Sequence, residues 1–249
     1  MKKILFLAML FTASVAVNAQ SVDDILAKYF ENTGGMDKWK NLTGIKMSAK
    51  VNQMGMDIPL TIYQMKDGRT ATVITFQGKE MKQGVYDGTN LWSTNFMTMK
   101  AEKSDAESTE NFKTTLGDFP DPFLDYKSKG YKAELIGKET VEGTECFKIK
   151  LTRKPLMVDG KQEENASFYF FDANDYVPIL TETEAKSGPG KGMISQSKMS
   201  DYQEVNGLLF PFSMTMTMKG AGQSQTILTT AVELNPKVDA ALFALPADK

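Results

Sequence analysis

The sequence predicts a mainly β fold, an unclosed and strongly curved antiparallel half-barrel with a helical lid on its concave face. Three observations predict it. One amphipathic helix opens the body of the chain, hydrophobic residues then alternate with a period of two from Ile45 to Leu234, and one helix-compatible insertion divides the alternating segments. Only a few turn residues separate most neighbouring segments, so these strands must pair antiparallel. A sheet of that many strands must curl, close or split.

The first 19 residues have the pattern of a secretory signal. Lys2 and Lys3 precede an apolar run, and Ala19 ends a small-residue motif before Gln20. This order predicts a signal peptide over residues 1–19 that is cleaved after Ala19. The run is shorter than the roughly 20 apolar residues of a membrane span. Since Gln20 is not a cysteine, we expect an exported chain without a lipid anchor, not itself embedded in a membrane.

Residues 20–249 are expected to form one domain, because the sequence shows no Gly/Ser linker and no repeat. The formal net charge is −2, or −4 once Lys2 and Lys3 are removed, and charges of both signs are interspersed. This distribution argues against nucleic-acid binding. The chain has no histidine and one cysteine, Cys146, which excludes Ser-His and Cys-His nucleophilic sites and histidine-ligated zinc. We expect no metal, no cofactor, and a buried Cys146.

The first predicted element of the body is a helix over Val22–Phe30. Ser21 is suited to cap its N-terminus, and acidic residues in the first turn favour the helix dipole. Gly34 and Gly35 supply a stop. Its apolar residues recur at helical spacing and form one stripe: Ile25, Leu26, Tyr29 and Phe30.

Strands follow the helix. Two flank the turn Met54–Asp57, with Met47, Ala49 and Val51 on one face of the first and Ile58, Leu60 and Ile62 on one face of the second. The other expected strands are Thr70–Phe76, Glu80–Tyr86, Thr89–Lys100, Lys132–Thr140, Thr144–Thr152, Glu164–Asp172, Pro178–Ala185, Met193–Tyr202, Leu209–Lys219 and Gln223–Leu234.

The insertion lies between Ala101 and Lys129. Glu102–Leu116 is polar and compatible with a helix, whereas Phe119–Leu124 is apolar and contains two prolines. We expect this segment to form a flap over the sheet.

Methionine indicates what the concave face could bind. The chain has 16 methionines, and Met214 and Met216 alternate with threonines on one predicted strand. Flexible thioethers suit a surface that adapts to varied apolar guests, although any single methionine is more often ordinary core. We predict an apolar cavity lined by Met47, Val51, Ile58, Leu60, Ile62, Leu91, Met97, Met99, Phe168, Phe170, Met214 and Met216. The predicted lid comprises Ile25, Leu26, Tyr29, Phe30, Phe119 and Phe123.

Other motifs carry less information. Gly188–Gly192 lacks the Lys-Ser or Lys-Thr and the following helix of a phosphate loop, so we interpret it as a hairpin loop. Asp172–Asp175 lacks the glycine and glutamate of a calcium loop. Asp118, Asp121 and Asp125 could form a carboxylate cluster, but aspartate beside proline is common in loops.

The order and spacing of several motifs resemble the LolA/LppX lipoprotein-carrier superfamily. They are Val22–Tyr29 with Thr33–Gly35, Tyr169–Asp172 with Pro178, Ser200–Gly207 with Phe210 and Pro211, and Val232–Asp239 before Leu242, Phe243 and Pro246. The resemblance implies an unclosed barrel lidded by helices, a periplasmic location, and a cavity that shields lipoprotein acyl chains between membranes. It also implies an arginine that holds the lid shut, for which the chain offers only Arg69 and Arg153, neither in a matching motif.

The leading hypothesis is therefore a soluble periplasmic carrier, and not an enzyme. It would take lipoprotein acyl chains or another lipid from an inner-membrane donor protein toward an outer-membrane acceptor. One alternative is a lipid-binding sensor of envelope stress. Another is a hydrolase or isomerase that uses carboxylates such as Asp118 and Asp121. A third is a purely structural envelope protein.

Overall fold

The computed structural model of the protein describes residues 20–53, 55–188 and 190–246. The predicted signal peptide, residues 1–19, lies outside the described residues. The helices are α1 (Val22–Asn32), α2 (Met36–Lys40), α3 (Ala106–Lys113) and the 3-10 helices η1 (Leu116–Asp118) and η2 (Ala240–Leu242). The strands are β1 (Gly44–Gln53), β2 (Met56–Met65), β3 (Thr70–Phe76), β4 (Lys79–Tyr86), β5 (Leu91–Thr94), β6 (Ala101–Lys103), β7 (Lys132–Val141), β8 (Thr144–Thr152), β9 (Leu156–Val158), β10 (Lys161–Glu163), β11 (Ala166–Asp172), β12 (Pro178–Glu184), β13 (Ile194–Val205), β14 (Leu208–Met218) and β15 (Ser224–Leu234).

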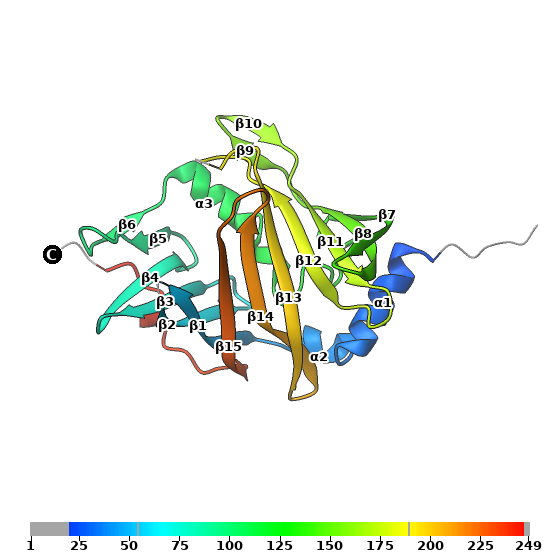
Figure 1. Ribbon diagram of the computed structural model, residues 1–249. Helices are drawn as coiled ribbons and strands as arrows, with labels where there is room; N and C mark the ends of the chain where they lie inside the picture. The colour runs from blue at the N-terminus through cyan, green and yellow to red at the C-terminus, as the bar shows by residue number, and fades with distance from the viewer. Residues whose placement is uncertain (1–19, 54, 189, 247–249) are drawn as a thin grey trace, which may run out of the picture.

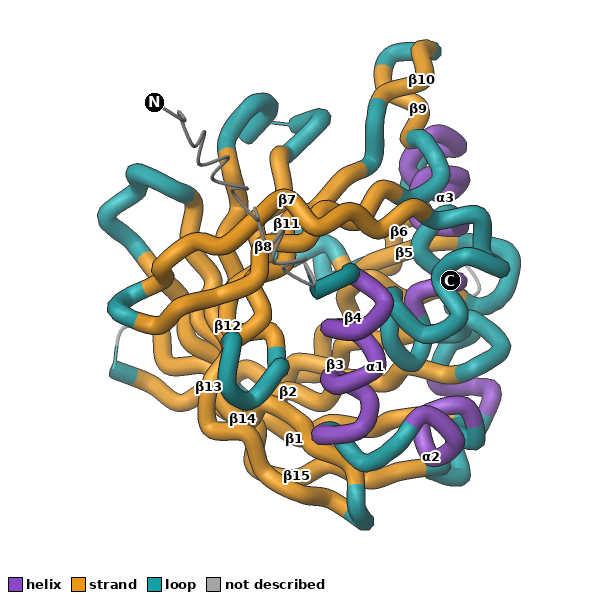
Figure 2. Tube along the Cα trace, turned by 90° about the vertical axis from the view of Figure 1, so that its right-hand side faces the viewer, coloured by secondary structure: helices purple, strands orange, loops and turns teal. Residues whose placement is uncertain are grey.

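The main feature is one sheet of 13 antiparallel strands in the order β6-β5-β4-β3-β2-β1-β15-β14-β13-β12-β11-β8-β7. The sheet curves around a hollow and its two edge strands, β6 and β7, do not pair with each other, so the predicted open half-barrel is confirmed. In Figure 1, α1 and α2 lie at one end of the curve and β5 and β6 at the other. Figure 2 views the first end directly and shows α1 lying across it.

The largest difference from the sequence prediction lies between β4 and α3. The single strand expected over Thr89–Lys100 is wrong, because the chain reverses and forms the hairpin β5–β6. The side-chain oxygen of Asn95 accepts hydrogen bonds from the backbone N–H groups of Met97 (2.8 Å) and Thr98 (3.0 Å) and so fixes a turn. The helix expected over Glu102–Leu116 is shorter, because α3 begins only after the N-cap Asp105.

Helix α1 forms as predicted, and its ends explain its position. Ser21 and Asp24 make a capping box, which satisfies the first free N–H groups of the helix. After α1 the backbone of Gly34, at φ +114°, touches the turn before β14, where a Cβ would overlap the carbonyl oxygen of Gly207. Only glycine permits this approach. In the described part of the chain, no helix is long and apolar enough to cross a membrane.

A buried aromatic cluster fills the concave side at the α1 end. The Phe171 ring on β11 lies 5.4 Å from the ring of Tyr29 on α1 and 5.4 Å from that of Phe123. Ile149 and Leu151 of β8, both fully buried, lie beneath these rings. The stripe of α1 and the apolar part of the insertion therefore pack against the sheet as core.

The convex face carries two smaller clusters. The C-terminal segment covers β3 to β5, where Trp92 Nε1 donates to the carbonyl oxygen of Phe243 (3.1 Å). On the outer side of β11 and β12, Cys146 packs with Phe170 and Leu180, so its predicted burial is confirmed. The sheet is thus stabilised from outside as well as inside.

The aromatic cluster predicts a large stability contribution from Phe171, which is fully buried. We expect Phe171→Ala to lower the free energy of unfolding by about 3–5 kcal/mol, because the truncation leaves a cavity between α1 and the sheet. Ile136→Ala, at a position that is 54% exposed, should change it by less than about 0.5 kcal/mol. Denaturant unfolding of both variants measures the difference. Equal losses would show that the cluster is not the main core.

Candidate apolar binding site

The candidate site is an open apolar cavity of about 930 Å³ at the end of the half-barrel opposite α1. Its volume is in the range of small-ligand sites, about 300–1,000 Å³. Its lining residues are Val51, Gln53, Met56, Ile58, Leu60, Ile62, Thr72, Ile74, Phe76, Gln77, Lys79, Met81, Phe96, Met97, Met99, Gln225 and Ile227.

The floor of the cavity is the concave face of five adjacent strands. Val51 on β1 pairs with Ile58 on β2 and with Ile227 on β15, so the three side chains lie on the same face. The floor continues onto β3, where Ile74 is opposite Leu60. Because these strands alternate with a period of two, the apolar side chains of the floor all project from one face of the sheet.

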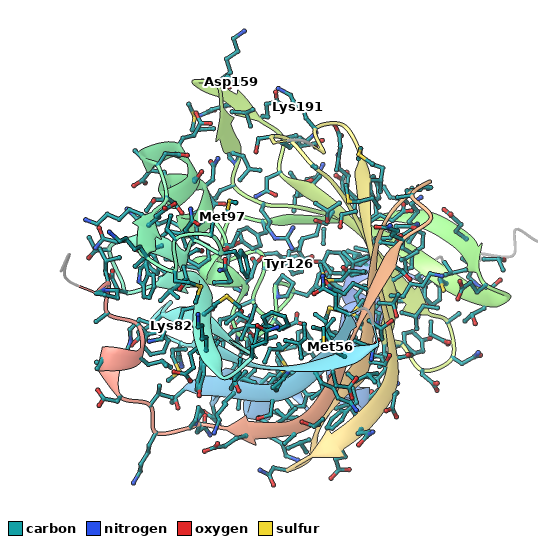
Figure 3. All side chains as sticks on the ribbon, turned by 60° about the vertical axis from the view of Figure 1, so that its left-hand side comes forward. Met56, Lys82, Met97, Tyr126, Asp159 and Lys191 are labelled. Atoms are coloured by element: carbon teal, nitrogen blue, oxygen red, sulfur yellow. The ribbon has the colours of Figure 1, made fainter. Side chains whose placement is uncertain are left out.

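The turn between β5 and β6 supplies the wall across from this floor. Phe96, Met97 and Met99 of this turn line the cavity. Figure 3 looks toward this side of the molecule and shows Met97 and the Met56 side chain of β2 on different walls of the hollow. A guest between them would contact apolar groups on both sides.

The polar groups of the lining are few. Among the described residues of the lining, Lys79 is the one that is charged, and Gln53, Gln77 and Gln225 contribute neutral amides. Such a surface can bind an apolar guest by burial and accept a polar group at the rim. Its chemistry is that of a binding site for a hydrocarbon group.

The structure brings together six of the residues that the sequence placed in the cavity: Val51, Ile58, Leu60, Ile62, Met97 and Met99. Met47, Met214 and Met216 lie on the same concave face but outside this lining. Met47 packs toward the aromatic cluster, whereas Met214 and Met216 are opposite Ile227 and Gln225 on β15. Met97 and Met99 reach the cavity from a turn and not from alternating strand positions.

Three predicted lining residues lie elsewhere. Leu91 is beside α3, in the small depression that includes Glu110 and Lys113. Phe168 and Phe170 are on the convex face of β11, where the ammonium of Lys148 lies about 5 Å from both rings. Their assignment to the concave face is corrected here, because the neighbouring residues Tyr169 and Phe171 are the ones that point inward.

The sequence interpretation missed the lining residues of β3 and β4. Thr72, Ile74 and Phe76 alternate on a strand whose limits were predicted correctly, so extending the face assignment from β2 across the hairpin would have found them. Alternation did not point to Phe96, because this residue was expected within a strand and lies in a turn.

The residues predicted as a lid pack the other end of the half-barrel. Phe119 is partly buried against the aromatic cluster, and the others are buried within it: Ile25, Leu26, Tyr29, Phe30 and Phe123. None of these six is among the residues that line the cavity. In this structure they fill space beside the cavity and do not cover it.

A buried ion pair joins the insertion to the sheet. Arg153, at the end of β8, donates from Nε to Asp118 Oδ2 (2.9 Å), and its other nitrogens bond Ser167 Oγ and Tyr169 Oη of β11. The Arg153 side chain is only 9% exposed. Separating Asp118 from Arg153 would leave a buried charge without its partner, which is energetically costly. The ion pair therefore holds η1 against the sheet.

A second polar contact joins the insertion to α1. Tyr29 Oη donates to Asp121 Oδ2 (2.7 Å), and the backbone N–H of Phe123 donates to Asp121 Oδ1 (2.8 Å). Burial raises the pKa of the Asp121 carboxyl above its ordinary value of 3.8, although these hydrogen bonds lower it. Lys129 lies nearby and donates to the Asp121 carbonyl oxygen (2.9 Å), and burial lowers the pKa of its ammonium.

Comparison with known proteins extends this description. A family model described as "Uncharacterized protein" matches residues 117–247, slightly more than half of the chain. No curated protein matches the sequence significantly.

Solved structures show the same fold. A LolA superfamily protein from Nitrosomonas europaea aligns at a TM-score of 0.55 and 12% identity, covering 90% of this chain and 97% of that one. A DUF1329 family protein from Desulfovibrio piger aligns at 0.53 and 15% identity, covering 88% and 97%. A putative outer membrane lipoprotein-sorting protein domain from Vibrio parahaemolyticus aligns at 0.52 and 11% identity, covering 88% and 94%.

The Asp121 contact predicts an unusual pH dependence of stability. At low pH the carboxyl is protonated in both the folded and the unfolded chain. As the pH rises above 3.8 the unfolded chain releases this proton first, so the site loses stability until the raised pKa of the folded state is passed. We expect the free energy of unfolding of the wild type, relative to Asp121→Asn, to fall between these two pKa values. Denaturant unfolding across this range measures it, and a relative rise would contradict the raised pKa.

Proposed function

The chain belongs to the family whose model spans residues 117–247, its fold is that of LolA superfamily structures, and we propose that it is a periplasmic carrier of lipid acyl chains. The cavity between β1–β4, β15 and the β5–β6 turn is the observation that carries this proposal. Its guest is the acyl chain of a lipoprotein or of another lipid.

The energetics of burial support such a role. Each methylene removed from water contributes about 0.8 kcal/mol, so a chain of about 15 methylenes gains about 12 kcal/mol before the entropy of binding is subtracted. This gain needs no directional contact with the guest. A lining of aliphatic and thioether side chains with Lys79 as its one charged residue fits that requirement.

The same argument bears on release of the guest. The hydrophobic gain holds the acyl chain until an acceptor offers a deeper apolar site, so release requires such an acceptor. The outer membrane lipoprotein-sorting description of the Vibrio parahaemolyticus neighbour supports an outer-membrane acceptor. An inner-membrane donor protein is the other half of the proposed route. An export signal over residues 1–19 is consistent with this route.

We propose a binding role and not a catalytic one. The two carboxylates that the sequence offered for acid–base chemistry both have structural partners. Asp118 is paired with Arg153, and Asp121 accepts hydrogen bonds from Tyr29 and Phe123. Both lie outside the cavity lining.

Filling the cavity tests the proposal. Ile74→Trp places an indole in the cavity and displaces several methylenes of the guest, so we expect palmitic acid to bind at least about tenfold more weakly. Thr75→Trp is the matched control, because Thr75 is the next residue of β3 and is exposed on the opposite face. Isothermal titration with palmitic acid measures both.

Each possible outcome of this titration leads to a different conclusion. Loss of binding in Ile74→Trp with wild-type binding in Thr75→Trp supports the cavity as the lipid site. A wild-type protein that neither binds palmitic acid nor carries lipid in native mass spectra would overturn the proposal. Equal binding by all three proteins would place the lipid elsewhere.

A further inference from the structure

The β5–β6 turn exposes two adjacent large hydrophobic side chains, Phe96 and Met97. Met97 is 95% exposed and Phe96 is 61% exposed, the two highest values among the large hydrophobic residues of the described chain. Single exposed hydrophobic residues are normal on protein surfaces, but adjacent ones at the rim of a cavity mark an interaction site.

Hydrogen bonds fix the backbone of this turn. Asn95 accepts from the N–H groups of Met97 and Thr98 through its side chain and from Met99 N–H (2.8 Å) through its backbone. Its side-chain amide donates to Glu102 Oε1 (2.9 Å) on β6. A backbone turn fixed in this way presents Phe96 and Met97 to the solvent, so docking costs little additional backbone entropy and the remaining cost is the ordering of the side chains.

The charge pattern fits a hydrocarbon partner. Residues 93–99 carry no charged side chain, and Lys100 follows immediately. Insertion of the tip into an apolar phase would therefore desolvate no charge. A lysine next to the tip can remain among lipid headgroups while its stem lies along apolar surface.

The tip is also continuous with the cavity. Phe96, Met97 and Met99 form part of its wall, and Met56, which is 50% exposed, lines another wall. We propose that the β5–β6 turn docks the protein on a lipid bilayer, with Phe96 and Met97 inserted among the headgroups and acyl chains. This inference rests on the proposed function, and it names a bilayer as the surface at which the cavity is loaded or emptied.

This geometry has a functional consequence. With the tip inserted, the opening of the cavity faces the hydrocarbon, and an acyl chain can pass along Met97 and Met99 without crossing water. The binding is interfacial, with apolar contact as its main contribution, and so it should depend weakly on salt.

Vesicle flotation tests the proposal with the purified protein. Vesicles of phosphatidylcholine, alone and with phosphatidylglycerol, are used at low and high salt. We expect the wild type to float with both, and Phe96→Ser with Met97→Ser to bind about tenfold or more weakly, because burying each such side chain is worth at least that factor. Ile136→Ser is the matched control, since Ile136 is 54% exposed on β7 at the other edge of the sheet.

A second measurement reports insertion directly. Phe96→Trp places an indole at the tip, while the natural Trp39 and Trp92 are buried and thus poorly accessible to a quencher in the bilayer. Vesicles with brominated acyl chains should quench the emission of this variant more strongly than that of the wild type. Equal quenching would contradict insertion of the tip.

The failures of the two proposals are distinguishable. A wild-type protein that binds palmitic acid from solution but stays in the aqueous fraction with every vesicle overturns membrane docking alone, and leaves the tip to a protein partner. A wild type that floats through Phe96 and Met97 but takes up no palmitic acid overturns the carrier function alone. Loss of flotation in Ile136→Ser to the same extent as in the tip variant overturns the role of the turn.

Discussion

The structure depends on how the concave face of a 13-stranded open sheet is covered. An uncovered apolar face of this size would be unstable in water, and one helix is too small to cover all of it. At one end, α1 and the segment around Phe123 pack onto Phe171 and Ile149 and exclude solvent. At the other end none of the described helices contributes to the cavity lining, and about 930 Å³ stays open. The candidate binding site is the part of the concave face that the core does not fill.

Polar contacts hold α1 and the insertion in place at the packed end of the half-barrel. Arg153 bonds Asp118 and the strand β11, and Tyr29 bonds Asp121, so the insertion is tied to both the sheet and α1. Displacing α1 would expose the aromatic cluster and leave Asp121 without its tyrosine donor. Access to the cavity therefore does not require α1 to move, and the entrance is on the side of the β5–β6 turn. The arginine that joins the insertion to the sheet is Arg153, at a place that no sequence motif marked.

The sequence was sufficient to predict the position of most strands, but for some strands it did not show which face points inward. Thr70–Phe76 and Thr144–Thr152 were predicted to the residue, since hydrophobic alternation and turn residues agree there. On β11 four aromatic residues follow one another, so alternation could separate Phe168 from Phe171 but could not show which of the two faces points inward. The β5–β6 turn was missed because its residues favour strands, and a single side chain, Asn95, reverses the chain there. Tertiary contacts such as that of Arg153 with Asp118 join segments that are distant in the sequence, and no sequence pattern predicts such a pairing.

If the protein carries lipid as proposed, the energetics of transfer explain why an exposed apolar turn lies beside the cavity. Hydrophobic burial strongly favours taking an acyl chain from water, but a chain in a bilayer is already in hydrocarbon and gains almost nothing by moving into a protein. The barrier to exchange is then the passage of methylenes through water between the two apolar phases. A cavity wall that continues into the bilayer removes that passage without an energy source. On the proposed docking, Phe96 and Met97 are exposed where they join the cavity wall to the bilayer and so shorten the path of the guest through water.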